Sequence, residues 1–312
     1  MMHIVFSTDD GYAVGCGVCI CSIVRHNDPK ECYFHIFTSS LNAENRAKFA
    51  EIGSTYCCKI DIVDVDKTMF DSVGINGRFT VYTYYRFLAP QLLDCDKSLY
   101  FDCDILVRGS IKELWETDIT DAPLAAVEDQ AYSQDPKQFI EHIGPYNHTY
   151  FNSGVILLNH AYWREHNLLP QLIKAAQEHP SFTFYDQDAL NFLLRDKAKL
   201  MSHRFNYQLG WSMGKGAESL KDNPYHVPEE EAVVIHYCSS APWVYGDYHP
   251  LSHLFFEELE QSPWRGYDMT MTNWLITLTK PLKLVDEIFN TDKGYKLTSL
   301  IVYKWFKHRT KR

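Results

Sequence analysis

Residues 97–107 read KSLYFDCDILV. Apart from Asp102 and Asp104, this stretch is a nearly continuous apolar run, which is typical of a strand buried on both faces of a parallel sheet. Because two carboxylates do not belong inside such a strand, we predict that it ends there, at the carboxyl edge of the sheet where open α/β folds bind ligands. Residues i and i+2 of a strand point to the same side, so the two aspartates should converge and Cys103 should point away.

Two convergent carboxylates are costly to hold together unless a cation lies between them. Mg²⁺ and Mn²⁺ prefer oxygen ligands and often bridge such a pair to a diphosphate. Two other interpretations remain open on this stretch alone. The carboxylates can cap the following turn or helix, or they can be the nucleophile and general acid of a haloacid-dehalogenase-type phosphatase.

The composition indicates a folded α/β protein with an acidic body. The chain has 312 residues, of which 46% are hydrophobic and 14% aromatic, enough for one large domain or two modest ones. The net charge is −10, yet nine basic residues face three acidic ones from residue 280 onward. An acidic body argues against nucleic acid as a partner. We predict one domain over residues 1–265 and a separate basic tail over residues 266–312.

The nine cysteines do not form a metal-binding pattern. Cys16 and Cys19 have the C-x-x-C spacing, but no second Cys/His pair follows at ligand spacing. We expect buried thiols in a reducing cytosol. The N-terminus runs straight into an apolar strand without a basic region, so no signal peptide is expected. The longest apolar run, residues 14–24, is too short to span a bilayer.

Strands and helices alternate along the first two thirds of the chain. The predicted strands cover residues 3–6, 33–38, 59–65, 124–127, 151–159 and 233–237, besides the one that ends at the aspartates. The predicted helices cover residues 14–25, 42–52, 82–93, 162–178 and 186–194. This order predicts a Rossmann-like, mostly parallel central sheet flanked by helices and built by right-handed crossovers. The turn after the first strand lacks G-x-G-x-x-G, so dinucleotide binding is not indicated.

Polar residues follow several of these strands. Asp9 and Asp10 can accept hydrogen bonds from a base or ribose, or they can cap the helix that follows. In the strand of residues 151–159, Asn152 offers both a donor and an acceptor, and Gly154 allows close backbone approach.

Two later residues admit both a structural and a functional interpretation. Asp186 opens a predicted helix, where an acidic side chain suits the helix dipole. His236 ends the apolar strand VVIHY, and most such histidines are structural. Its position late in the sheet, after a carboxylate pair, makes it a candidate third metal ligand.

Taken together, these segments resemble glycosyltransferase family 8, which includes bacterial lipopolysaccharide galactosyl- and glucosyltransferases and glycogenin. The matching segments, in family order, are FSTDDGY (6–12), YTYYRF (82–87), LYFDCDILV (99–107), FNSGVILLN (151–159), YDQDALN (185–191), RFNY (204–207) and HYCSSAPW (236–243). The set is specific although no single member is. No phosphatase motif follows Asp104, so the phosphatase interpretation is dropped.

The resemblance implies a single-domain GT-A fold that transfers a hexose from a UDP-sugar with retention of configuration, assisted by Mn²⁺, or by Mg²⁺ as a second possibility. The implied metal ligands are Asp102, Asp104 and His236. The implied donor-binding residues are Ser7, Asp9, Tyr12, Arg86, Asp102, Cys103, Asn152, Ser153, Asp186, Gln187 and His236. Asp9 and Tyr12 would lie at the uridine, and Arg86, Asn152 and Asp186 around the hexose. Gln187, close to the anomeric carbon, and Asp186 are the implied catalytic residues.

The implied chemistry fits these residue types. A metal ion neutralises a diphosphate leaving group, and the pocket must tolerate an oxocarbenium-like centre. Retaining hydrolases use a carboxylate nucleophile, for which Asp186 and Asp188 are the only candidates evident in these motifs. We favour same-face attack, in which the departing phosphate oxygen takes the proton of the acceptor.

Two departures from the family pattern bear on activity. Relatives read H-x-x-G-x-x-K-P-W, whereas residues 236–243 are one residue shorter and lack both that Gly and that Lys. Gly11 also replaces an Asn common at the uracil site. These changes are expected to weaken donor affinity or shift donor choice, unless a residue such as Lys215 compensates. The alternative to an active enzyme is therefore a sugar-nucleotide-binding protein with weak or no transfer.

The tail lies outside the family motifs. Leu297, Ile301 and Trp305 recur at helical spacing beside Lys304 and Lys307. This pattern favours an interfacial helix on an anionic membrane, the alternative being a solvated basic end. We therefore expect a cytoplasmic enzyme, peripheral on the inner face of the plasma membrane, that glycosylates a saccharide or glycolipid acceptor of the cell surface. Glucose and galactose are not distinguished, since they differ by one hydroxyl group.

Overall fold

The computed structural model describes residues 1–75, 80–130, 143, 150–208, 225–238, 241–243 and 251–267. The predicted tail beyond residue 267, residues 131–142 and 144–149, Lys215, and residues 239 and 240 lie outside the described residues. The β-strands are β1 (Met2–Ser7), β2 (Cys32–Thr38), β3 (Lys59–Asp64), β4 (Lys97–Phe101), β5 (Ile105–Val107), β6 (Leu124–Glu128), β7 (Phe151–Asn159), β8 (Lys199–Met201), β9 (Tyr207–Gln208) and β10 (Val234–His236). The α-helices are α1 (Ala13–His26), α2 (Ala43–Tyr56), α3 (Ala89–Leu92), α4 (Lys112–Glu116), α7 (His160–Glu165), α8 (Leu168–Glu178), α9 (Asp186–Leu194) and α11 (Ser252–Leu259).

A mostly parallel sheet forms the centre of the described chain, as predicted. Seven strands run in the order β3-β2-β1-β4-β7-β6-β8. The pairs β3–β2, β2–β1, β1–β4 and β6–β8 are parallel. β7 runs antiparallel to both of its neighbours, β4 and β6. The start of β7 therefore meets the end of β4, which brings residues 152–154 next to the aspartate pair.

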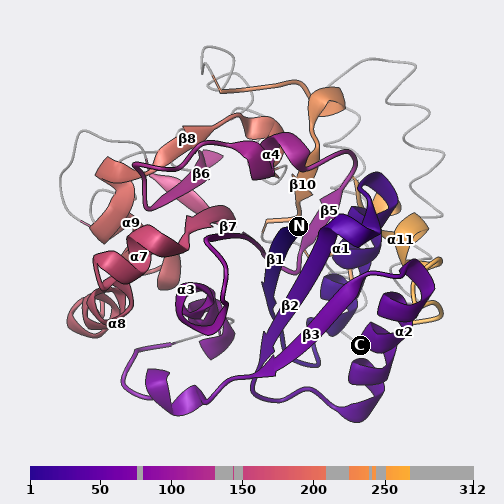
Figure 1. Cartoon of the computed structure of the whole chain (residues 1–312), viewed down its shortest axis with the longest axis horizontal. Helices are drawn as coiled ribbons and strands as arrows, with labels where there is room; N and C mark the ends of the chain where they lie inside the picture. The colour runs from indigo at the N-terminus through magenta and orange to yellow at the C-terminus, as the bar shows by residue number, and fades with distance from the viewer. Residues whose placement is uncertain are drawn as a thin grey trace, which may run out of the picture.

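Successive side chains of the central strands pack alternately into two hydrophobic cores, one on each face of the sheet. Ile4 and Phe6 of β1 join the core formed with α1, α2 and α11, whereas Val5 joins the core formed with α3, α7, α8 and α9. β7 divides its side chains in the same way. Figure 1 shows these two groups of helices on opposite sides of the strands. Burial on both faces explains why the central strands read as continuous apolar runs.

The stretch of residues 97–107 contributes to two sheets rather than to one strand. β4 ends at Phe101, as predicted, but β5 pairs with β10 in a separate three-stranded sheet of order β5-β10-β9. The N–H of Asp102 still donates to the carbonyl of Gly154 at 2.8 Å and so extends the β4–β7 ladder. The carbonyl of Asp104 accepts from the N–H of Tyr237 at 2.9 Å and so belongs to the β5–β10 ladder. The aspartates thus lie at the seam between the sheets.

Two predicted helices differ from the structure. Residues 82–93 form a 3₁₀ segment, Val81–Leu88, followed by the short helix α3, with Pro90 in its first turn. Residues 162–178 form two helices, α7 and α8, because Asn167 between them has a φ of 47°, outside the right-handed helical region. Short-range apolar spacing does not distinguish these local geometries.

The described cysteines are all free, and most are buried. Burial raises the pKa of Cys16, Cys19 and Cys21, which pack as small apolar side chains in the core of α1. Within the part of the chain that the structure describes, no helix is long and apolar enough to cross a membrane.

Candidate active site

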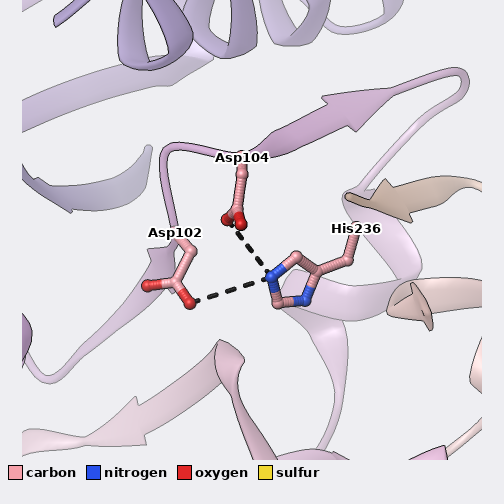
Figure 2. Close-up of side chains that lie close together, drawn as sticks. All are labelled: Asp102, Asp104 and His236. Carbon is pink, nitrogen blue, oxygen red and sulfur yellow. Dashed lines mark ion pairs between the residues drawn. The ribbon is translucent and has the colours of Figure 1, made fainter. Parts of the chain in front are cut away.

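Asp102, Asp104 and His236 converge at the seam between the two sheets (Figure 2). Nε2 of His236 lies 3.2 Å from Oδ1 of Asp104 and 3.9 Å from Oδ2 of Asp102. One ligand atom from each residue lies within 4.8 Å of the other two. The pairing of β10 with β5 puts His236 opposite Ile105, directly beside Asp104. Two aspartates from one turn and a histidine from a strand much later in the sequence therefore present two carboxylates and one imidazole to a single point.

Gly154 makes room for this cluster. A Cβ atom at this position would lie 2.3 Å from Cε1 of His236 and 2.8 Å from Oδ2 of Asp102. Real Cβ atoms do not approach other heavy atoms so closely, so any larger residue would push the imidazole or the carboxylate out of place. The close backbone approach predicted for Gly154 is confirmed, and the group approached is the His236 ring.

The acid and the base of this cluster stabilise each other's charged forms. Burial opposes ionisation of Asp104, but His236 beside it holds the pKa of the carboxyl below its ordinary value. Burial likewise lowers the pKa of His236, yet Cys238 and Asp104 together raise it well above the ordinary value. Concentrated negative charge at Asp104 is what favours a cation at this point, whether a proton on His236 or a metal ion.

Arg86 links the cluster of Asp102, Asp104 and His236 to Asp186 at the start of α9. Its guanidinium is buried and donates from Nη2 to Oδ1 of Asp102 at 2.8 Å, while Nε lies 3.1 Å from Oδ2 of Asp186. Nη1 donates to the carbonyl of Ser153. The guanidinium also lies over the Tyr100 ring, 4.2 Å from its centroid, so its position is fixed on every side.

Asp186 and Gln187, at the start of α9, are held against β7. The Ser153 hydroxyl donates to Oδ2 of Asp186 at 3.0 Å, and the Ser153 N–H donates to Oε1 of Gln187 at 2.9 Å. Nε2 of Gln187 donates to Oδ2 of Asp129 at 3.1 Å. Tyr185, just before the helix, has a φ of 45°. A non-glycine residue in this region carries strain, which the contacts of the following two residues hold in place.

Burial and the neighbouring Arg86 shift the pKa of Asp186 in opposite directions. Burial raises its pKa to about 6, although the Arg86 guanidinium acts in the opposite direction. Asp102 also contributes to the increase by like-charge repulsion. A buried carboxyl whose pKa is displaced by a specific charge partner is typical of functional sites.

The turn after β1 borders the same edge of the sheet. The Cys103 thiol donates to the Ser7 carbonyl at 3.3 Å, which ties this turn to the seam. Oδ1 of Asp9 accepts from the N–H of Tyr12 at 3.0 Å, and the exposed Tyr12 ring meets Trp243 edge-on at 5.5 Å. Despite this contact with Trp243, the Tyr12 side chain remains exposed at the surface.

Asp10 is hydrogen-bonded to residues at the start of α2. Its Oδ1 accepts from the N–H of Asn42 at 3.0 Å and from Nδ2 of Asn45 at 2.8 Å, at the start of α2. The prediction that Asp10 caps the helix directly after it is wrong, because α1 has no side-chain cap and Asp10 contacts the start of α2.

The implied residues from β4, β7, α9 and β10 thus come together, and the sequence interpretation missed several that support them. Asn206 accepts at Oδ1 from Nδ1 of His236 at 2.9 Å, and Asp129 holds both Gln187 and Asn152. The Tyr100 hydroxyl donates to Oδ1 of Asp102 at 3.0 Å. Asp129 could have been found, because it directly follows an apolar strand. Asn206 lies in the matching segment RFNY, but nothing in that segment indicates its contact with His236.

The chemistry of the donor set fits a divalent cation. Two carboxylate oxygens and one imidazole nitrogen are ligands that Mn²⁺ accepts readily, and Mg²⁺ shares the preference for the oxygens. The contact with Asn206 occupies Nδ1 of His236 and leaves Nε2 to face Asp102 and Asp104, as a metal-binding histidine requires.

Comparison with known proteins identifies the family. The sequence model described as Glycosyl transferase family 8 matches residues 3–246, more than half of the chain. This chain belongs to glycosyl transferase family 8. The family 8 chain is therefore a glycosyltransferase, as the motifs predicted.

Individual relatives agree with this assignment. The family 8 chain is 29% identical over 270 residues to lipopolysaccharide 1,3-galactosyltransferase of Salmonella typhimurium, covering 84% of this chain and 79% of that one. It is 28% identical over 275 residues to general stress protein A of Bacillus subtilis, covering 85% and 95%. The crystal structure of galactosyltransferase LgtC with donor and acceptor sugar analogues superposes with a TM-score of 0.74 at 28% identity, covering 84% and 96%. The fold is the GT-A fold.

Proposed function

We propose that this family 8 enzyme transfers glucose or galactose from a UDP-sugar to an acceptor hydroxyl with retention of configuration, and that it requires Mn²⁺. The observation that carries the proposal is the convergence of Asp102, Asp104 and His236 within 4.8 Å, next to the buried Arg86 and Asp186. A metal-ligand set beside a buried polar site is the arrangement that diphosphate-activated transfer needs.

Asp102, Asp104 and His236 would hold the ion, which would neutralise charge on the departing diphosphate. Asp9 and Tyr12 would bind the uridine, with Ser7 and Cys103 at the turn beneath it. The contact between the Cys103 thiol and the Ser7 carbonyl supports their adjacency.

The hexose would lie against Arg86, Asn152 and Asp186. In the transfer step, the bond from the anomeric carbon to the phosphate oxygen breaks, and a bond from the acceptor oxygen forms on the same face. The departing phosphate oxygen takes the acceptor's proton, so no separate base is needed. The Gln187 amide, near the anomeric carbon, and Asp186 would stabilise the positive charge that develops there.

We further propose a saccharide or glycolipid of the bacterial cell surface as acceptor. The support is the lipopolysaccharide transferases among the relatives, such as the lipopolysaccharide glucosyltransferase WaaO of Escherichia coli. The basic tail over residues 266–312 would hold the enzyme on the cytoplasmic face of the plasma membrane, where its lysines favour anionic lipid.

A second candidate function is sugar-nucleotide binding without turnover. The observation that favours it is the sequence after His236, which lacks the Gly and the Lys of relatives. Without that Lys, one cationic contact to the diphosphate is missing.

The test is release of UDP from a panel of UDP-sugars, with and without Mn²⁺, by wild type and Asp104→Asn. Metal-dependent release from one donor, lost in Asp104→Asn, supports the enzyme and identifies its sugar. Asp71→Asn, which changes an exposed carboxylate, is the matched control and should behave as wild type. Tight UDP binding without release from any donor favours the second function. Absence of metal-dependent UDP binding contradicts both.

A further inference from the structure

The imidazole of His236 has an amide neighbour that sets which of its nitrogens is free. Nδ1 of His236 lies 2.9 Å from Oδ1 of Asn206, a residue with no solvent exposure. Asn206 directly precedes β9, and β9 runs parallel to β10, which ends at His236. β10 thus pairs on one side with β5, which brings His236 to the aspartates, and on the other side with β9, which brings Asn206 to the opposite edge of the ring.

The orientation of the Asn206 amide follows from its other partner. Nδ2 of Asn206 donates to Oδ1 of Asn152 at 2.8 Å. Oδ1 of Asn152 also accepts from the backbone N–H of Gly154 at 2.9 Å, a group that can only donate. Nδ2 of Asn152 donates to Oδ2 of Asp129 at 3.1 Å. The contacts of Asn152 with Gly154 and with Asp129 therefore fix the orientation of its amide, with Oδ1 toward Gly154 and Asn206.

The orientation of the Asn206 amide determines which ring nitrogen of His236 carries a hydrogen. With Nδ2 committed to Asn152, Asn206 has only its carbonyl oxygen to offer to the ring, so Nδ1 of His236 must carry the hydrogen. When a bound ion displaces the other ring proton, the lone pair is therefore left on Nε2, the nitrogen that faces Asp102 and Asp104. Metal-binding histidines depend on such an outer partner to hold their tautomer and ring orientation.

We propose that Asn206 is a positioning residue of the metal site. It holds His236 in the Nδ1–H tautomer and links the ring, through Asn152, to the residues implied around the donor sugar. The inference rests on the proposed metal site. Asn206 itself touches neither the ion nor the substrate, so its effect is on ion affinity and on the tautomer.

Two substitutions separate this role from simple packing. Asn206→Leu removes the acceptor for Nδ1–H. Asn206→Asp keeps an acceptor there but loses the donor to Asn152. If Asn206 acts through the ring, the leucine variant binds Mn²⁺ about 10- to 100-fold more weakly, and the aspartate variant binds at least as tightly as wild type. A packing role predicts that affinity follows thermal stability in both variants instead.

The measurements are Mn²⁺ titrations of the full-length protein by electron paramagnetic resonance, together with melting temperatures. In a second experiment, ¹H–¹⁵N spectra of ¹⁵N-histidine protein loaded with diamagnetic Mg²⁺ report the His236 tautomer. We expect Nδ1–H in wild type and Asn206→Asp. An Nε2–H tautomer in the Mg²⁺-loaded wild type overturns the inference even if the leucine variant does not fold.

The outcomes also separate this inference from the function on which it rests. No Mn²⁺ or Mg²⁺ binding by wild type contradicts the proposed metal site. Normal binding by wild type with equal affinity in Asn206→Leu, or with equally weakened affinity in both variants, leaves the metal site standing and contradicts the role of Asn206.

Discussion

Arg86 and Asp102 form an ion pair in which Nη2 of the buried guanidinium lies 2.8 Å from Oδ1 of the partly exposed carboxylate. This contact engages one oxygen of Asp102 and leaves Oδ2 on the side of His236. The same guanidinium reaches Asp186 through Nε at 3.1 Å. One rigid cation thus orients a candidate metal ligand and a candidate sugar-binding carboxylate together, and the two carboxylates hold the pKa of Arg86 above its ordinary value against the effect of burial.

Replacing Arg86 by Lys should reduce transfer by about 100-fold, because an ammonium cannot span both carboxylates and small misplacements are costly. Arg86→Met should also destabilise the protein by about 3–5 kcal/mol, since it leaves the buried carboxylate of Asp186 without its cation. Transfer assays and urea denaturation measure the two effects. Arg25→Lys is the matched control, because Arg25 pairs with Glu258 on α11 at 2.7 Å. Full activity in Arg86→Lys would contradict the bridging role.

Gly154→Ala should weaken Mn²⁺ binding by about 10- to 100-fold, because the added Cβ displaces the His236 ring or Asp102. Overpacking should also cost about 1–3 kcal/mol of stability. Calorimetric metal titration and thermal melting test this. Gly74→Ala is the control, since nothing lies within 4 Å of a Cβ there. Unchanged metal affinity in Gly154→Ala would show that the ion, if bound, lies elsewhere.

Asp186 should titrate near pH 6 in the folded protein, because burial raises its pKa to that value. The unfolded value is about 3.9, so the folded chain takes up this proton first as the pH falls, and this group favours folding at lower pH. Arg86→Met should raise the pKa further by removing the cation that favours the carboxylate. Carboxyl ¹³C NMR, assigned with Asp186→Asn, measures the midpoint. A midpoint below 4 would contradict the effect of burial.

His160 should make stability fall in acid. Burial lowers its pKa to about 3, below the unfolded value of about 6.5. The unfolded chain therefore binds the proton first, and stability is lost as the pH drops below 6.5, by about 2 kcal/mol between pH 7 and pH 5. In urea denaturation, His160→Gln should show a smaller loss over this interval than wild type. His166→Gln, at an exposed position, should keep the wild-type slope.

Iodoacetamide should label the exposed Cys57 of the native protein and spare Cys16, Cys19 and Cys21. These three are buried, and burial raises their pKa, so little thiolate is available. Peptide mass spectrometry measures the labelling, and protein unfolded in guanidinium provides the fully labelled reference. Rapid native labelling at Cys16 or Cys19 would contradict their role as core side chains.

The convergence of Asp102, Asp104 and His236 could be predicted because these residues interrupt otherwise regular patterns. Asp102 and Asp104 break an apolar run, and His236 ends one. Each anomaly indicates a strand end at the ligand-binding edge of an α/β sheet. The mostly parallel sheet followed from the alternation of strands with helices.

The remaining features depend on pairings that local patterns do not encode. The alternation in β7 is the same whichever way the strand runs, so its antiparallel direction was not predictable. Ile105 reads as a continuation of β4 although it belongs to the second sheet. Asn206 lies between a 3₁₀ turn and β9, and only the β9–β10 pairing reveals its contact with His236.

An ion bound at the seam between the sheets would couple ion occupancy to local unfolding. β5, β9 and β10 are two or three residues long, and such short strands are marginal without further support. An ion held jointly by Asp102, which extends β4, and His236, which ends β10, would clamp the small sheet to the large one. Because a ligand stabilises the state that binds it, the amide of Tyr237 should exchange with deuterium more slowly once the ion is bound. The sheet of β5, β10 and β9 would then be more stable against local unfolding in the ion-bound enzyme than in the ion-free enzyme.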